Sequence, residues 1–118
     1  MANELTAQLS LVGTAANFGD ALALTVSETL DVTKDIKGVS KTQLSTGDLT
    51  LYATSYGKSY LYFKNLDGSI NITVSFGTTV SIELGAGEFA FLPWSGAAAV
   101  VVAAASGTPF LEHALFES

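Results

Sequence analysis

The chain of 118 residues contains no cysteine, no arginine and a single histidine, His113. The lack of cysteine excludes disulfides, thiolate zinc sites and catalytic thiols, and one histidine cannot form a histidine cage around a metal ion. All five basic residues are lysines, against eleven acidic residues, so the formal net charge is −6. Because such a chain repels phosphate and lacks the bidentate guanidinium group that binds it best, we expect no nucleic-acid partner.

Charged residues of either sign are scarce. They make up 14% of the chain, where about 25% is usual, while hydrophobic residues make up 48%. Serine, threonine, asparagine and glycine must therefore cover much of the surface, and this composition excludes a disordered chain. The length suits one domain and is too short for two, so we predict a single domain over residues 1–118, with residues 1–20 as an N-terminal arm or the first strand.

Signals for export or membrane insertion are also missing. Residues 1–12 contain no lysine and alternate polar with apolar side chains, unlike a signal peptide. The longest apolar run, Ala97–Ala105, has nine residues, whereas a membrane-spanning helix needs about 20. We therefore expect a soluble protein without an export signal of its own and without a membrane partner.

Apolar residues recur mostly with a period of two. Residues 5–11 and 22–26 alternate in this way, and residues 70–76 give the clearest strand pattern of the chain. Helical spacing fits only the first of these segments, through Leu5, Leu9 and Val12. From residue 42 onward, turn residues separate short strands at the spacing of a sandwich or barrel. The pattern predicts an all-β, antiparallel β-sandwich of nine or ten strands in two packed sheets.

Three segments between these strands have specific interpretations. Residues 34–41 carry most of the lysines around Gly38, which is typical of a solvated loop or of an edge strand protected by charge. Asp67-Gly68 predicts a tight two-residue hairpin turn. Residues 85–87, Gly-Ala-Gly, predict a turn between strands, since no helix follows that would make a phosphate site.

Catalytic residues are not predicted. Glu112 and His113 are neighbours, and neighbours on a strand point to opposite faces, so they cannot form an acid–base pair. We interpret His113 as a polar residue on the outer face of the last strand or at a subunit contact. No serine lies in a G-x-S-x-G motif. We therefore expect a protein that is not an enzyme and that has no cofactor or metal site.

Aromatic residues suggest an alternative function. A pyranose ring stacks on aromatic side chains, and the chain offers several that could form a platform for sugars. The sequence lacks a nearby group of Asp, Asn and Arg to bind the sugar hydroxyls, but a carbohydrate-binding β-sandwich module stays an alternative. The candidate platform residues are Tyr52, Tyr56, Tyr60, Tyr62 and Trp94.

The apolar run Ala97–Ala105 indicates a strand that is covered on both faces. The cover is either a second subunit or a loop that crosses a central strand. The mean hydropathy of +0.41 favours an oligomer, because a small domain cannot easily hide that much apolar surface by itself. We predict an oligomer interface formed by this run and the final strand, with Ala99, Val100, Val101, Val102, Phe110 and Phe116 as the contact residues.

Three segments carry a resemblance to a known group of proteins. Tyr60–Ser69 is an aromatic strand that ends in Lys-Asn before a turn, Leu84–Ala90 contains a Gly-Glu-Phe corner, and Phe110–Glu117 is an acidic and apolar ending. Together they resemble small structural proteins of tailed bacteriophage virions, over residues 41–118. Ala86 stands where that group more often has proline.

The resemblance implies a β-sandwich or jelly-roll subunit of the virus particle. The leading role that it implies is that of a capsid cement or decoration protein, and the alternative role is attachment to a tail or fibre. The implied partners are other copies of the chain, as a homotrimer, and the major capsid protein or other virion proteins. The implied location is the capsid surface, after synthesis in the cytoplasm of the bacterial host, and the resemblance implies no catalytic residues.

Overall fold

The computed structural model describes residues 3–13, 22–32, 36–78 and 80–118. The regular structure of these residues consists of ten β-strands and one short 3-10 helix. The predicted all-β class is therefore confirmed. The elements are β1 (Asn3–Gly13), β2 (Leu22–Val32), β3 (Ile36–Gln43), β4 (Leu49–Tyr52), the 3-10 helix η1 (Thr54–Tyr56), β5 (Ser59–Asn65), β6 (Ile72–Phe76), β7 (Val80–Leu84), β8 (Phe89–Trp94), β9 (Val100–Ala104) and β10 (Phe110–Glu117).

The chain divides into two compact units, Met1–Thr33 and Lys34–Ser118. In the first unit, β1 and β2 pair with each other as an antiparallel two-stranded sheet, from Asn3 opposite Val32 to Gly13 opposite Leu22. The sequence predicted one sandwich domain over residues 1–118, whereas the structure forms the sandwich from the second unit. The strand interpretation of residues 5–11 is confirmed over the helical one.

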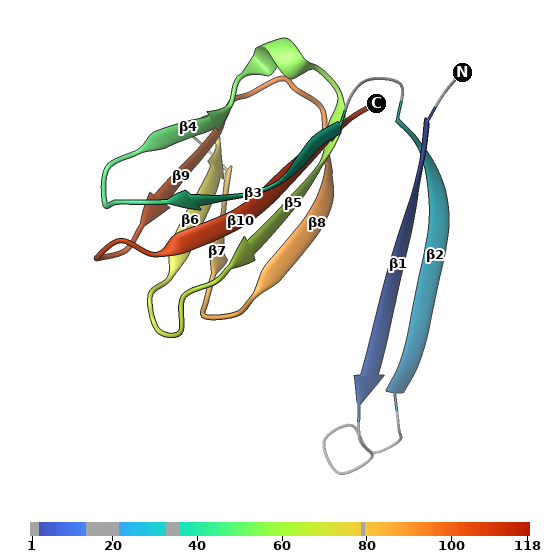
Figure 1. Cartoon of the computed structure of the whole chain (residues 1–118), viewed down its shortest axis with the longest axis horizontal. Helices are drawn as coiled ribbons and strands as arrows, with labels where there is room; N and C mark the ends of the chain where they lie inside the picture. Colours follow the sequence, from blue (N-terminus) through green and yellow to red (C-terminus); the bar gives the residue numbers. More distant parts are fainter. Residues whose placement is uncertain (1–2, 14–21, 33–35, 79) are drawn as a thin grey trace. The chain divides into compact units, whose positions relative to one another are not determined.

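The second unit is a sandwich of two four-stranded antiparallel sheets (Figure 1), with strand orders β3-β10-β5-β8 and β4-β9-β6-β7. Four hydrogen-bonded pairs are nested in the sequence: β3 with β10, β4 with β9, β5 with β8 and β6 with β7. The pairs β10 with β5 and β9 with β6 then close the two sheets. A nested antiparallel ribbon that is rolled up in this way is a jelly roll. The predicted antiparallel sandwich is confirmed, with eight strands in it.

The core lies between the two sheets and follows from the period of two. In β5 every second side chain, from Ser59 to Asn65, is buried, and β9 shows the same alternation from Val100 to Ala104. The side chains at the alternate positions of each strand point away from the core, because successive side chains of a pleated strand lie on opposite faces. The core residues come from both sheets: Leu44, Tyr52, Leu61, Phe63, Ile72, Val74, Leu84, Trp94, Val100, Val102, Ala104, Leu111 and Leu115.

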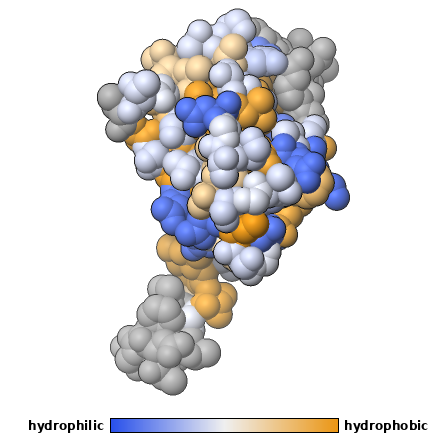
Figure 2. All heavy atoms as spheres, turned by 90° about the vertical axis from the view of Figure 1, so that its left-hand side faces the viewer, coloured by the Kyte–Doolittle hydropathy of each residue, from blue (hydrophilic) through white to orange (hydrophobic). Residues whose placement is uncertain are grey.

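Weakly polar side chains cover much of the rest. Figure 2 shows a face of the molecule on which many of the spheres are pale, with smaller strongly hydrophilic and strongly hydrophobic groups scattered among them. The strand that carries Lys37 and Lys41, β3, lies at the edge of its sheet. Of the two interpretations of residues 34–41, the edge strand is therefore confirmed for residues 36–41.

The turn at Asp67-Gly68 does not form the predicted hairpin. The strands on either side of it, β5 and β6, belong to different sheets, so the turn is a corner that carries the chain across the sandwich. The Asp67 carboxylate accepts hydrogen bonds from the backbone N–H groups of Ser69 and Ile70, both at 2.8 Å. These bonds hold the pKa of Asp67 below its ordinary value. Asp67 stabilises a turn, but a turn signal is local and does not determine which sheet the next strand joins.

Asn65 joins this corner to a second one. Its side-chain amide is fully buried and donates to the carbonyl oxygens of Ile70 at 2.7 Å and Leu84 at 3.0 Å. Its backbone donates to the carbonyl of Glu88 and accepts from the N–H of Gly87. Two of the segments behind the phage resemblance, Tyr60–Ser69 and Leu84–Ala90, therefore meet at Asn65.

Helices contribute little to the described residues. Their one helical element, η1, has three residues. None of the described helical segments has the length and apolar character needed to cross a membrane.

Candidate functional site

The outer side of the β3-β10-β5-β8 sheet carries a concentration of aromatic side chains. On β5 and β8 the inward positions contribute to the core, and the alternate positions place Tyr60, Tyr62, Phe89 and Phe91 on the outer side. On β10 the same alternation leaves Phe110 and Phe116 there. We define these six residues as the aromatic face. They are half of the twelve aromatic residues of the chain.

Cross-strand pairing arranges the aromatic face in rows. Tyr60 lies between Pro93 and Phe116, and Tyr62 lies next to Phe91 on one side. The Tyr60 and Phe91 rings are stacked, with centroids 6.0 Å apart and planes at 12°. The Nζ atom of Lys58 lies 5.1 Å from the centre of the Tyr60 ring. These contacts hold the rings of Tyr60 and Phe91 against each other and place a cation beside Tyr60.

Several members of the aromatic face are well exposed. Phe89 is 63% exposed, Phe110 46% and Phe91 43%. Tyr60, Tyr62 and Phe116 are half-buried by their neighbours. Exposed apolar side chains that gather on one face of a protein often mark a place where another molecule binds.

A row of charges crosses the same face. Lys64 is opposite Glu112, which is opposite Lys41 in the next strand, so that signs alternate across three strands. The hydroxyl of Tyr62 donates to Oε1 of Glu112 at 2.6 Å. Burial, together with this hydrogen bond and the charge of Glu112, raises the pKa of Tyr62 to about 12. Tyr62 is therefore a neutral donor at ordinary pH and fixes the Glu112 carboxylate within the face.

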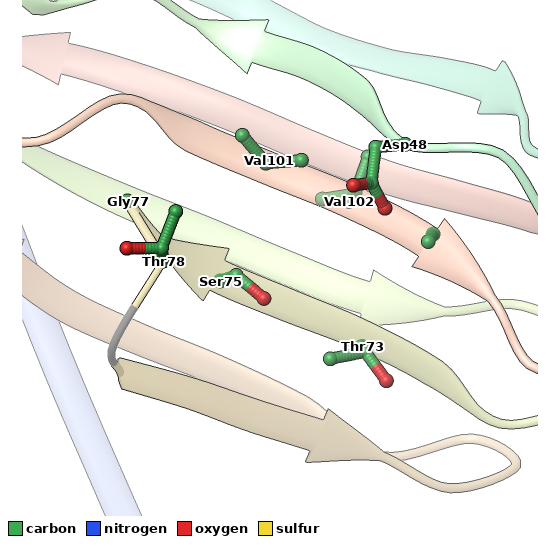
Figure 3. A pocket seen from close by; sticks show the side chains of 8 residues that line it. Asp48, Thr73, Ser75, Gly77, Thr78, Val101 and Val102 are labelled. Atoms are coloured by element: carbon green, nitrogen blue, oxygen red, sulfur yellow. The ribbon is translucent and has the colours of Figure 1, made fainter.

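The outer side of the other sheet is different in kind. Apart from Glu83, which lies opposite Thr73, its outward side chains are mostly small. We define the small ones as the small-residue face: Thr50, Thr73, Ser75, Ser81, Val101 and Ala103. A hollow of about 300 Å³ lies over part of it, with Asp48 and Thr78 at its border. Figure 3 shows that Thr73, Ser75 and Val101 contribute its floor from neighbouring strands.

His113 lies inside the sandwich, and the interpretation that placed it on the outer face is wrong. It points inward from β10, it is 8% exposed, and both ring nitrogens have partners. Nδ1 is 2.7 Å from the hydroxyl of Tyr52, and Nε2 is 2.8 Å from Oγ1 of Thr42. In neutral imidazole one nitrogen donates and the other accepts, so the two hydroxyls satisfy the ring in either tautomer.

Burial sets the protonation of this group. It lowers the pKa of His113 below its ordinary value and raises that of Tyr52. Glu112 points to the opposite side of the sheet, as expected for its neighbour on a strand. His113 is enclosed and is hydrogen-bonded on both ring nitrogens. Because Tyr52 lies on β4 and His113 on β10, their hydrogen bond joins the two sheets as a polar link.

The six predicted interface residues do not lie on one surface. Val100 and Val102 are fully buried in the core of the sandwich. Val101 is half-buried on the small-residue face, and Ala99 lies just before β9. Phe110 and Phe116 belong to the aromatic face, on the other sheet. The strand β9 is central in its sheet, between β4 and β6, so the apolar run needs no second subunit at its edges.

The residues considered for sugar stacking do not form one platform. Tyr52 and Trp94 are buried in the core, at 6% and 4% exposure. Tyr56 packs edge-on against Tyr52, with ring centroids 5.9 Å apart. Only Tyr60 and Tyr62 lie on the outer side of a sheet. No group of three or more potential metal ligands lies together within the part of the chain that the structure describes.

Sequence reasoning missed Phe89 and Phe91 as surface residues. Part of the signal was present, because Tyr60 and Tyr62 share one face of their strand and Phe89 and Phe91 share one face of theirs. The sequence did not show that these rings lie outside, because an apolar residue at nearly every position is also typical of a strand that is buried on both faces. Comparisons with protein-family models, with curated proteins and with solved structures found no match for this chain.

Proposed function

We propose that the chain is a structural, non-enzymatic subunit that acts by binding another protein through the aromatic face. The leading setting is a tailed-phage virion, where it would serve as a capsid cement or decoration protein. Attachment to a tail or fibre is the alternative setting, with the same kind of contact. The observation that carries the proposal is the set of exposed rings on the outer side of one sheet, above all Phe89, Phe91 and Phe110.

The chemistry of the aromatic face suits a protein partner. Buried tyrosine and phenylalanine side chains contribute a large share of binding energy at protein interfaces, and the stacked Tyr60 and Phe91 are already ordered. The alternating row of Lys64, Glu112 and Lys41 supplies polar groups that fix the register of a partner. A flat sheet face with rings and paired charges favours a broad contact over the enclosure of a small ligand.

The positions of two segments that resemble phage structural proteins, Tyr60–Ser69 and Leu84–Ala90, support the phage setting. Asn65 links the corner after β5 to the corner before β8, and these two strands carry four of the six members of the aromatic face. The motifs of the resemblance are therefore also the elements that position the proposed contact. The net charge of −6 repels packaged DNA, which favours the outside of a shell.

The partners that follow are the major capsid protein or another virion protein, and other copies of the chain, with a homotrimer as the proposed state. A structural subunit of a particle needs a stable fold and a broad contact surface, and it needs no catalytic turnover. A β-sandwich with a weakly charged surface has both properties.

The test uses the phage that encodes the chain. Virions are purified by density gradient, and the amount of the chain per particle is measured by quantitative mass spectrometry for the wild type, Phe91→Glu and Ser81→Glu. Both positions lie on edge strands, β8 and β7, but on opposite outer faces of the sandwich. We expect the wild type and Ser81→Glu to stay with the particle and Phe91→Glu to fall by about tenfold or more, because a carboxylate would be desolvated in the contact.

The fluorescence of Trp94, which is buried in the core, shows whether each purified variant has folded. Virions that lack the wild-type chain altogether would overturn the phage setting. Equal retention of two folded variants would overturn the aromatic face as the contact.

A further inference from the structure

The two outer faces of the sandwich differ in charge as well as in the size of their side chains. On the aromatic side, Lys41 and Lys64 occupy outward positions on either side of Glu112. Lys58 joins them, because its Nζ atom lies 5.1 Å from the centre of the Tyr60 ring. Three of the five lysines of the chain therefore gather on or beside the aromatic face, and Glu112 is the carboxylate between them.

The charged groups of the other outer face are acidic over the residues that the structure describes. Its strands β4, β9, β6 and β7 contain no lysine, Glu83 points outward from β7, and Asp48 borders the hollow. Packed sheets lie about 10 Å apart, and charges are screened over about 8 Å at physiological salt. A partner on the aromatic face therefore meets its lysines more strongly than the carboxylates of the opposite face.

We propose that the partner of the aromatic face is an acidic protein surface, with apolar side chains among its carboxylates. The proposal rests on the proposed function and adds the chemistry of the partner. A net charge of −6 by itself predicts a basic partner, whereas the local charge of this face predicts the opposite. The exposed rings, such as Phe89 at 63%, would pack on the apolar groups, while the lysines at their margin pair with the carboxylates.

The row of Lys64, Glu112 and Lys41 also sets the arrangement of the partner's charges. Neighbouring strands lie about 4.8 Å apart, so the two lysine positions are roughly 10 Å apart with Glu112 between them. The hydroxyl of Tyr62 donates to Glu112 at 2.6 Å and holds that carboxylate within the row. A matching surface has two carboxylates at this spacing and a hydrogen-bond donor between them.

The same row disfavours nucleic acid as the occupant. Rings and lysines on a sheet can also bind single-stranded nucleic acid. The Glu112 carboxylate, however, lies between the two lysines and would repel a chain of phosphates, which offer no donor to it. The chain also has no arginine, the residue that binds phosphate best. A protein surface can satisfy both signs of charge in the row.

The experiment measures how tightly the purified chain binds to particles that lack it. The particles come from the phage that encodes the chain, with the gene for the chain disrupted. Bound chain is measured by co-sedimentation at about 50 and about 300 mM NaCl, which changes the screening of surface charges. The test variant, Lys41→Gln with Lys64→Gln, removes two positive charges from the aromatic side.

The matched control is Thr50→Glu with Ser81→Glu. It changes the net charge by the same amount, at exposed positions on the edge strands of the other sheet. The fluorescence of the buried Trp94 shows that each variant has folded.

We expect the wild type and the control to bind alike and to weaken about tenfold between the two salt concentrations. The lysine variant should bind about tenfold more weakly at low salt, because each surface ion pair contributes a few-fold in affinity. It should also lose most of the salt dependence.

Three outcomes would overturn the acidic partner and leave contact through the aromatic face in place. They are equal losses of affinity in the lysine variant and the control, tighter binding of the lysine variant, and a lysine variant that binds like the wild type while Phe91→Glu does not bind. Loss of wild-type binding after nuclease treatment would show nucleic acid as the occupant and would also overturn the proposal. A wild type that does not bind the particles at all would overturn the proposed function itself, and the acidic partner with it.

Discussion

The two outer faces of the sandwich follow the same backbone rules and carry very different side chains. Each belongs to a four-stranded antiparallel sheet whose inner side packs into one shared core. The outer side of one sheet holds the six rings of the aromatic face, whereas the other holds the threonine, serine, valine and alanine side chains of the small-residue face. Alternation in a strand determines which residues make the core and leaves the opposite side open to selection for function. The aromatic face departs most from what the fold alone requires.

The largest expected effect tests the difference between the inner and the outer side of one strand. Val102 is fully buried, and its neighbour Val101 is half-buried on the small-residue face. Val102→Asp should lower the free energy of unfolding by about 3 to 5 kcal/mol or prevent folding, because a buried carboxylate would have no partner. Val101→Asp should cost about 1 kcal/mol or less, mainly through the low strand propensity of Asp. Urea unfolding followed by Trp94 fluorescence measures both.

The sequence predicts that the whole run Ala97–Ala105 is covered on both faces. A loss of stability for Val101→Asp as large as that for Val102→Asp would show that the outer side of β9 is covered too. It would also erase the contrast between the two outer faces.

An intermediate effect is expected at the polar link that joins the two sheets. His113→Phe leaves the hydroxyls of Tyr52 and Thr42 without their partner and should lower the free energy of unfolding by about 1 to 3 kcal/mol. The link also predicts a pH dependence. Because burial lowers the pKa of His113 from its ordinary value of 6.5, the unfolded chain binds the proton more readily than the folded one, so stability falls as pH drops below about 6.5 and levels off below the lower folded pKa.

Urea unfolding of the wild type and His113→Phe at about pH 7.5 and about pH 5.5 checks this window. The part of the pH dependence due to the histidine should vanish in the variant. If both proteins lose the same stability between the two pH values, the histidine is not the titrating group.

The smallest effect on stability is expected from exchanging residues between the outer faces. Phe89→Ser and Ser81→Phe each change one exposed position on an edge strand. Both should shift the free energy of unfolding by no more than about 0.5 kcal/mol, as is usual for surface substitutions. The surface properties should change in opposite directions: binding of a hydrophobic dye should fall for Phe89→Ser and rise for Ser81→Phe. Equal dye binding by the wild type and Phe89→Ser would mean that the aromatic face is not the dominant apolar patch.

Much of the fold could be predicted from local patterns. Residues 70–76 and 5–11 alternate in the sequence and form strands in the structure, and the lysines of residues 36–41 lie on an edge strand. The opposite directions of Glu112 and His113 follow from the same geometry. These predictions succeeded because the pleat of a strand is a property of the backbone and depends on no distant residue.

The candidate site was harder to predict. The Asp67-Gly68 turn was interpreted as a hairpin, although β5 and β6 lie in different sheets. His113 was placed outside, yet it faces Tyr52 across the core. The interface predicted from β9 and β10 combined residues of different sheets. In each case the local signal was present, but the outcome depended on which strands become neighbours.

The sequence by itself determined that the chain forms strands, which side chains share each face of a strand, and that acidic charge and the lack of cysteine and arginine limit its chemistry. The tertiary structure decided the nesting of strand pairs, and with it which of two alternating faces turned inward. It also brought the rings of β5, β8 and β10 onto one surface. The physical reason is that alternation is set within a strand, whereas the pairing of strands that lie far apart in the sequence is selected by the packing of the whole core. Thr42 and His113, for example, are 71 residues apart.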